Sequence, residues 1–144
     1  MNDRKDRLVL MVGLPLSGKT TIVNRHFIPA GYAVVCPDDV RLALHGYRYV
    51  AKAEPFVWVI VDVMIDALLM SGNRVVVDAT FTTEKRRAPF MVRFKPIVPV
   101  LCWVKTAEGI CIERARERDD EEIIPVIERQ AAQLEEPEHY FVVE

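Results

Sequence analysis

The feature that most constrains this chain is a phosphate-binding motif near its N-terminus. Residues 13–20 read GLPLSGKT and fit the pattern G-x-x-x-x-G-K-[ST] without a mismatch. The apolar run 8–12 before the motif has the length of a strand, and residues 21–27 after it continue as a predicted helix. The motif in this context predicts a nucleotide-binding domain. The alternative is a glycine-rich and serine-rich turn that opens an ordinary helix.

The residue types in the motif match the chemistry of a bound triphosphate. Gly13 and Gly18 permit a tight backbone path, so that amide N–H groups and the helix N-terminus converge on the β-phosphate. Lys19 neutralises charge on the β- and γ-phosphates, and the Thr20 hydroxyl is placed to bind Mg²⁺. ATP and Mg²⁺ are therefore the expected ligands. The predicted nucleotide-binding residues of this loop are Gly13, Ser17, Gly18, Lys19, Thr20 and Thr21.

The rest of the chain alternates between strand and helix patterns. Further strands are predicted at 32–36, 74–78, 100–104 and 140–143, and helices at 37–46, 53–71, 83–94, 106–116 and 123–134. Pro89 is expected to interrupt its helix, and Thr106 to cap the following one. Residues 1–144, half of them apolar, predict a single α/β domain. Its fold class is a three-layer P-loop sandwich with helices on both faces of a mostly parallel, five-stranded sheet.

Acidic residues follow two of the predicted strands, as the phosphate loop follows the first. Because ligands of such sheets bind at the carboxyl ends of the strands, Gly13, Asp38 and Asp78 should face one crevice. Asp38 is placed to accept a proton from an acceptor hydroxyl, with Arg41 to hold an anionic part of the acceptor. Equally, Asp38 could only cap a helix, and Arg41 could be a solvated surface residue.

The other candidate residues also have two interpretations each. Asp78 ends a strand like a Walker B carboxylate that holds Mg²⁺, or it caps a helix or pairs with an arginine. Arg87 belongs to a basic run at 85–87 that either meets substrate phosphate or is a solvated helix face. Arg114 and Arg118 share one face of a helix, within a candidate lid at 113–125 that could close over ATP. Ion pairs with nearby acidic residues are the alternative for both arginines.

Charge and cysteine content limit the class of protein. The net charge of -2 argues against a protein that coats duplex DNA by bulk electrostatics, so nucleic-acid contacts should be local. Three cysteines without CxxC spacing are typical of reduced thiols inside the cell. The apolar segment near the N-terminus is too short to span a membrane or form a signal core. We expect a cytoplasmic protein without a membrane partner, of undetermined oligomeric state.

Together, four segments resemble one group of P-loop kinases. They are GLPLSGKTT at 13–21, PDDVRLALHG at 37–46, VVVDATFTTEKRR at 75–87 and ERARERDDEEIIPVIERQ at 113–130. This group includes phage-type polynucleotide 5′-kinases and small AAA-like ATPase proteins of the zeta-toxin-like and AAA_33 types. The loop alone marks a very large superfamily, whereas the D-D-x-x-R element and the arginine-bearing lid make the resemblance narrower.

The resemblance implies a role for each matching residue. It implies Asp38 as general base, Arg41 as a contact to the acceptor's phosphate, and Asp78 as a support of the site. It also implies Arg118, preceded by Arg114, as the lid arginine pair, and a sheet with strand order 2-3-1-4-5. Two departures stand on the acceptor side: Pro37, where a polar or basic residue is frequent, and Phe81, where many relatives have Asn.

Three functions remain open from the sequence. The first is an ATP-dependent kinase that acts on the 5′-hydroxyl of DNA or RNA. The second keeps the ATP half of the site and changes the acceptor to a nucleoside, sugar or other small molecule. The third is an AAA-like ATPase or nucleotide-binding module, although the chain is too short to add the helical domain that such motors carry. A GTPase is disfavoured because no N-K-x-D element is present.

Overall fold

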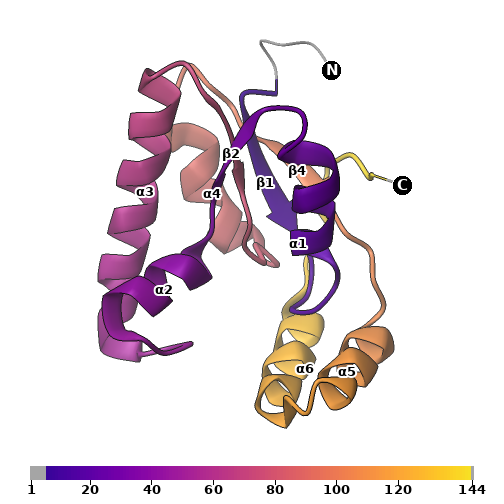
Figure 1. Cartoon of the computed structure of the whole chain (residues 1–144). Helices are drawn as coiled ribbons and strands as arrows, with labels where there is room; N and C mark the ends of the chain where they lie inside the picture. Colours follow the sequence, from indigo (N-terminus) through magenta and orange to yellow (C-terminus); the bar gives the residue numbers. More distant parts are fainter. Residues whose placement is uncertain (1–5, 144) are drawn as a thin grey trace.

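The computed structural model describes residues 6–143, which form a parallel sheet with helices on both faces (Figure 1). The strands are β1 (Leu8–Val12), β2 (Tyr32–Val35), β3 (Arg74–Val77) and β4 (Val100–Trp103). The α-helices are α1 (Lys19–Ile22), α2 (Pro37–His45), α3 (Glu54–Met70), α4 (Glu84–Arg93), α5 (Glu108–Glu117) and α6 (Ile124–Gln133). A π-helical turn, η1 (Val23–Phe27), extends α1, and short 3₁₀ turns η2 (Ala51–Ala53) and η3 (Glu121–Ile123) precede α3 and α6. Residues 1–5 and residue 144 lie outside the described residues.

The sheet has the order β2-β3-β1-β4, and all of its pairs are parallel. Every residue of β1 is buried, because this central strand is covered on both faces and paired on both edges. On one face, β1 and β3 pack against apolar residues of α3 and α4, including Ile65 and Phe90. On the other face, they pack against Val23 and Phe27 of η1. The predicted three-layer α/β fold class is confirmed.

The predicted fifth strand is reduced to a single bridge, so the sheet has four strands. Phe141 forms an isolated parallel bridge with Cys102. The Trp103 amide donates to the Phe141 carbonyl at 3.0 Å, and the Phe141 amide donates to the Leu101 carbonyl at 3.0 Å. The Tyr140 ring also meets the Trp103 ring edge to face, with 5.0 Å between centroids. The order 2-3-1-4-5 is therefore right for four strands and wrong for the fifth as a regular strand.

Two local expectations are wrong for identifiable reasons. Pro89 lies inside a continuous α4 and does not interrupt it, because Phe90 and Phe94 anchor that helix in the core. Thr106 does not cap α5, because the N-cap residue of that helix is Ala107. The Thr106 hydroxyl instead donates to the Ser17 carbonyl at 2.6 Å and so ties the end of β4 to the phosphate loop.

Within residues 6–143 we find no helix that combines the length and the apolar character needed to cross a membrane.

Candidate functional site

The phosphate loop leaves the carboxyl end of β1 and curls around the Lys19 side chain. The Gly13 amide donates to the Thr80 carbonyl at 3.0 Å, which fixes the start of the loop against the segment after β3. Leu16 and Gly18 have φ values of 62° and 104°, so the loop reverses through two left-handed residues before α1. The Lys19 ammonium donates to the carbonyls of Gly13 at 3.1 Å and Leu14 at 2.6 Å. Lys19 is 7% exposed, and this buried amine lies inside the loop.

Gly13 is required by close packing and not by its backbone angle. A Cβ atom at this position would lie 2.7 Å from the Ser17 hydroxyl oxygen and 3.0 Å from the Val104 carbonyl oxygen. We expect Gly13→Ala to lower the free energy of unfolding by about 1–3 kcal/mol, as overpacking does. Gly109→Ala is the matched control. Its Cβ would meet nothing within 4 Å in the first turn of α5, so helix propensity should raise stability slightly. Urea unfolding measures both, and a stable Gly13→Ala protein would contradict the packing argument.

Thr20 and Asp78 form the oxygen-rich part of the site. The Thr20 hydroxyl donates to the Asp78 carboxylate at 2.7 Å, which joins the phosphate loop to the end of β3. Asp78 is 9% exposed, and burial raises the pKa of its carboxyl group, while the Thr20 hydrogen bond and Lys19 oppose that shift. Among residues 6–143 there is no cluster of three or more His, Cys, Asp or Glu side chains suited to a metal ion. A hydroxyl beside one carboxylate nevertheless fits Mg²⁺, which keeps several waters and binds through few protein oxygens plus phosphates.

The charges of Lys19, Asp78 and Asp38 act on one another. Burial lowers the pKa of Lys19 to about 8, and the carboxylates of Asp78 and Asp38 oppose that shift. Asp38 also contributes to raising the pKa of Asp78. The backbone geometry agrees: the Asp78 amide donates at 2.9 Å to the carbonyl of Val35, three residues before Asp38, and the Thr20 hydroxyl donates to the Asp78 carboxylate. The structure therefore brings the ends of β1, β2 and β3 to a common site.

The low pKa of Lys19 gives nucleotide binding a proton signature. Between pH 8 and 10.5 the Lys19 amine is mostly protonated in the unfolded chain and mostly neutral in the folded one. The contribution of Lys19 to the free energy of unfolding therefore increases as the pH rises through this range. A bound phosphate stabilises the ammonium form and reverses the shift. We expect ADP binding in EDTA to take up more protons at pH 9 than at pH 7, and Lys19→Met to abolish the difference. Calorimetry in buffers of different ionisation enthalpy measures this uptake. An equal uptake at both pH values would contradict it.

Asp38 and Arg41 meet at the start of α2, where Glu54 joins them. One guanidinium nitrogen of Arg41 donates to the Asp38 carboxylate at 2.7 Å. Two others donate to both carboxylate oxygens of Glu54, at 3.0 and 2.7 Å. The Asp38 side chain remains 74% exposed and open to an incoming group. Neither aspartate at the start of α2 caps it, because Cys36 is the N-cap and no side chain caps that end.

The sequence analysis missed Glu54 as part of this cluster. Its only sequence signal is an acidic residue in the first turn of α3 before Pro55. In the structure, Arg41 lowers the pKa of the Glu54 carboxyl group through their hydrogen bonds. Glu54 therefore orients the arginine that lies beside the candidate base.

The two arginines of the candidate lid, Arg114 and Arg118, occupy different places. The Arg114 guanidinium donates to the Leu16 carbonyl at 2.9 Å, and so α5 is attached directly to the phosphate loop. Apolar contacts reinforce this attachment: Leu14 packs in a small core with Cys111, Ala115 and Ile127 of α5 and α6. Arg118, just beyond the end of α5, is exposed. Ser17 is buried within the loop, and Thr21 is exposed on α1.

Arg87 is separate from the other candidate residues. It is 5% exposed, and its guanidinium donates to the Phe81 carbonyl at 2.7 Å and the Glu135 carbonyl at 2.9 Å. These contacts join the loop after β3 to the C-terminal segment and do not favour a substrate contact. Its neighbour Arg86 is exposed and lies over the Trp58 ring, 4.9 Å from the centroid.

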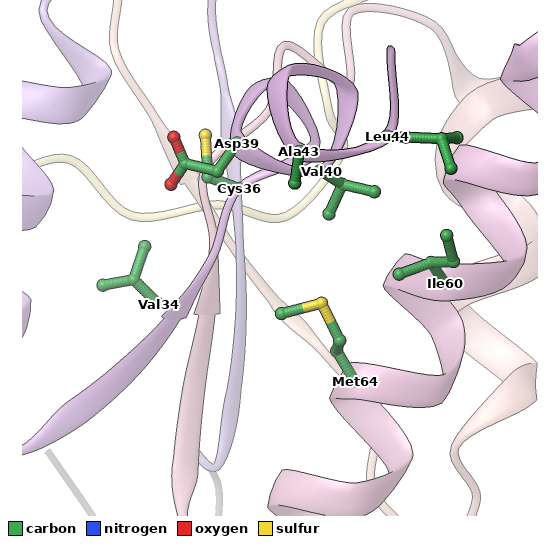
Figure 2. A pocket seen from close by; sticks show the side chains of 8 residues that line it. All are labelled: Val34, Cys36, Asp39, Val40, Ala43, Leu44, Ile60 and Met64. Atoms are coloured by element: carbon green, nitrogen blue, oxygen red, sulfur yellow. The ribbon is translucent and has the colours of Figure 1, made fainter. Parts of the chain in front are cut away.

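A pocket of about 370 Å³ opens between β2, α2 and α3. In Figure 2, Asp39 and Cys36 lie together at one end, and Leu44 and Ile60 lie at the other. The pocket is lined by Val34, Cys36, Asp39, Val40, Ala43, Leu44, Ile60 and Met64. No phosphate-loop residue lines it, so this pocket is not part of the nucleotide site described above.

Comparison with solved structures places the fold among P-loop kinases. A chain in the Pnkp1/Rnl/Hen1 complex aligns with 27% identity and a TM-score of 0.64, over 74% of this chain and 38% of its own length. A gluconokinase from Sinorhizobium meliloti 1021 aligns with 18% identity and a TM-score of 0.67, over 97% of this chain and 83% of its own. The Mycobacterium tuberculosis APS kinase CysC, solved with AMPPNP and APS, aligns with 17% identity and a TM-score of 0.64, over 96% and 87%.

The gluconokinase and the APS kinase are too distant in sequence to show more than the fold. The chain spans well under half the length of its match in the Pnkp1/Rnl/Hen1 complex. No curated protein matches the chain. A family model described as an AAA domain, AAA_33, matches residues 8–137. The expected resemblance to this group of P-loop kinases is thus confirmed, and the chain belongs to the AAA_33 family of AAA domains.

Proposed function

We propose that the protein is an ATP-dependent kinase that transfers the γ-phosphate of ATP to a hydroxyl group, with the 5′-hydroxyl of DNA or RNA as the preferred acceptor. One observation carries the proposal. The candidate base Asp38 is exposed and follows the end of β2, whose Val35 carbonyl accepts a hydrogen bond at 2.9 Å from the amide of Asp78, the partner of Thr20. A nucleotide-binding module needs the loop and its cation, but it has no need of a carboxylate open to an incoming hydroxyl beside them.

The residues of the phosphate loop would hold the donor. Lys19 and the amides of the loop bind the β- and γ-phosphates, and Thr20 and Asp78 hold Mg²⁺ directly or through water. A Mg²⁺ ion held there would supply positive charge that offsets the negative charge developing on the phosphates. Arg118 supplies a further cation from the lid, residues 113–125, whose base is attached to the loop through Arg114.

The acceptor side would then work by proton abstraction. The Asp38 carboxylate takes the proton of the acceptor hydroxyl, the freed oxygen forms a bond to the γ-phosphorus, and the bond from that phosphorus to the β–γ bridging oxygen breaks to release ADP. Arg41, oriented by Glu54, holds an anionic part of the acceptor beside Asp38. The partial matches to chains of the Pnkp1/Rnl/Hen1 complex, one of them described as an RNA repair complex, support a nucleic-acid acceptor.

A small-molecule acceptor is the second candidate. The gluconokinase and the APS kinase overlap nearly all of this chain and most of their own length, which supports a small-molecule acceptor as the alternative. The same chemistry at Asp38 serves either acceptor, so the two candidates differ only in what Arg41 and its surroundings recognise.

An acceptor screen with labelled ATP and Mg²⁺ separates these functions. We expect label to appear on oligonucleotides with a 5′-hydroxyl end and not on matched oligonucleotides that already carry a 5′-phosphate. Transfer only to sugars, nucleosides or other small molecules would reject the nucleic-acid acceptor and retain the kinase. ATP hydrolysis without transfer to any acceptor would reject the kinase and favour an ATPase.

A further inference from the structure

An ion pair joins two segments that lie 72 residues apart in the sequence. The first is the arm, residues 46–50, between α2 and η2. The second is the lid linker, residues 118–123, between α5 and α6. Two guanidinium nitrogens of Arg48 in the arm donate to the two carboxylate oxygens of Asp120 in the lid linker, at 3.1 and 3.0 Å. This two-pronged geometry is the most directional form of an arginine–carboxylate contact.

The two segments come from opposite ends of the sheet. β2 leads into α2 and the arm, whereas β4 leads into α5 and the lid linker. β3 and β1 lie between them, and the phosphate loop leaves β1 at the same carboxyl edge. In Figure 1, α2 and the arm lie at the lower left, and α5 and α6 lie at the lower right. The Arg48–Asp120 pair therefore links the acceptor side of that edge to the donor side.

The backbone of the lid linker holds Asp120 in a fixed direction. The Asp119 amide donates to the Arg116 carbonyl at 3.1 Å, and the Asp120 amide donates to the Ala115 carbonyl at 2.9 Å. With Asp119 at a φ of 53°, these bonds form a Schellman ending of α5. The Asp120 carboxylate is thus rigidly connected to α5, and Arg118 lies only two residues before it. Restraining Asp120 therefore also restrains Arg118.

We propose that Arg48 and Asp120 form a clasp that holds the lid linker toward the arm, and that Arg48 is a positioning residue for Arg118. Glu122 adds a second negative charge that acts on Arg48 from the same linker. The side chains of Arg48 and Asp120 are 47% and 26% exposed, so salt and charge changes reach the clasp. The arm directly follows α2, which carries Asp38 and Arg41. The clasp therefore couples an acceptor bound at Asp38 and Arg41 to the position of Arg118.

The catalytic consequence rests on the proposed function, but the clasp itself is tested without substrate. Hydrogen exchange of the amides in 114–124 is measured in the wild type, in Arg48→Asp, in Asp120→Arg and in the charge-swapped double variant. We expect each single change to speed exchange by about threefold to fivefold, the upper range for an exposed pair, and the swap to restore protection. Lys52→Asp, an exposed cation in the neighbouring turn η2, should leave exchange unchanged.

The salt dependence of hydrogen exchange gives a second test, which begins with the wild-type protein. Raising NaCl from 0.05 to 0.5 M should speed exchange of 114–124 in the wild type and have little effect in Arg48→Asp, because the pair is already broken there. Unchanged exchange in both single variants, or equal salt effects in wild type and Arg48→Asp, would overturn the clasp.

Steady-state kinetics then test the positioning role. On the acceptor found by the screen, we expect kcat to fall about threefold to fivefold in each single variant and to recover in the swapped variant. If Arg48 instead binds an anion of the substrate, the swapped variant stays slow, and this result would overturn the positioning role. A protein without kinase activity would remove the proposed function and leave the exchange result standing.

Discussion

Replacing Lys19 by methionine is expected to lower ATP turnover by about a thousandfold or more. Methionine keeps the length of the side chain in its buried position and removes the ammonium group that the loop holds through the Gly13 and Leu14 carbonyls. Preorganised cations that meet the transferring phosphoryl group contribute this much in phosphoryl transfer. The measurement is the initial rate of ADP release with saturating Mg²⁺ and the acceptor found by the screen.

The Lys19 variant should still fold, because it replaces a desolvated charge with an apolar group of similar volume. Lys52→Met is the control, since Lys52 is exposed in η2 and outside the site. We expect its rate to equal that of the wild type. A Lys19→Met protein that keeps its cooperative unfolding and more than a tenth of the rate would show that the loop cation has no part in turnover.

Asp38→Asn is expected to lower kcat by about a hundredfold to ten-thousandfold, the usual contribution of a positioned general base. Asparagine keeps an oxygen that can accept the hydrogen bond from Arg41, so the geometry at the start of α2 should persist. ATP binding should be nearly unchanged, because the donor is held by the phosphate loop. Rapid-quench transfer from labelled ATP gives kcat, and calorimetry gives the affinity for ATP.

The neighbouring aspartate provides the matched control for this experiment. Asp39 lines the pocket between β2, α2 and α3, so Asp39→Asn removes one negative charge at nearly the same place without touching the candidate base. We expect kcat for Asp39→Asn to stay within about threefold of the wild type. Equal losses in both variants would assign the effect to the local charge, and an active Asp38→Asn would remove the general base from the mechanism.

Much of the fold followed from local sequence patterns. An unbroken apolar run such as 8–12 indicates a strand covered on both faces, and the phosphate-loop motif after it marks where the chain turns. Parallel pairing places the ends of β1, β2 and β3 at one edge, which is the reason that the sequence predicts one crevice for Gly13, Asp38 and Asp78. Segment 140–143 has an equally apolar pattern. A regular strand, however, must pair with its neighbour over several residues, and the pairing of this segment with β4 stops at one bridge.

The contacts that the sequence did not predict are between side chains brought together by the tertiary fold. Glu54 pairs with Arg41 because α2 and α3 pack side by side, and nothing in the local spacing of the two residues indicates this. Arg87 belongs to a basic run that is typical of a solvated surface, yet its side chain is buried and donates hydrogen bonds to two backbone carbonyls. The Arg48–Asp120 pair likewise joins segments 72 residues apart, which follow the two outer strands of the sheet.

Phe81, one of the two departures from the resemblance noted in the sequence, is part of the core and not of the surface. Its ring is 1% exposed and packs edge to face against Phe90, with 5.0 Å between centroids, and against Trp58. The backbone is left-handed there, at a φ of 43°, with its carbonyl held by Arg87. The phenyl group thus does not project toward an incoming alcohol. If the proposed kinase activity holds, its choice of acceptor depends on neighbouring residues in contact with solvent, and engineering of that choice would begin with them.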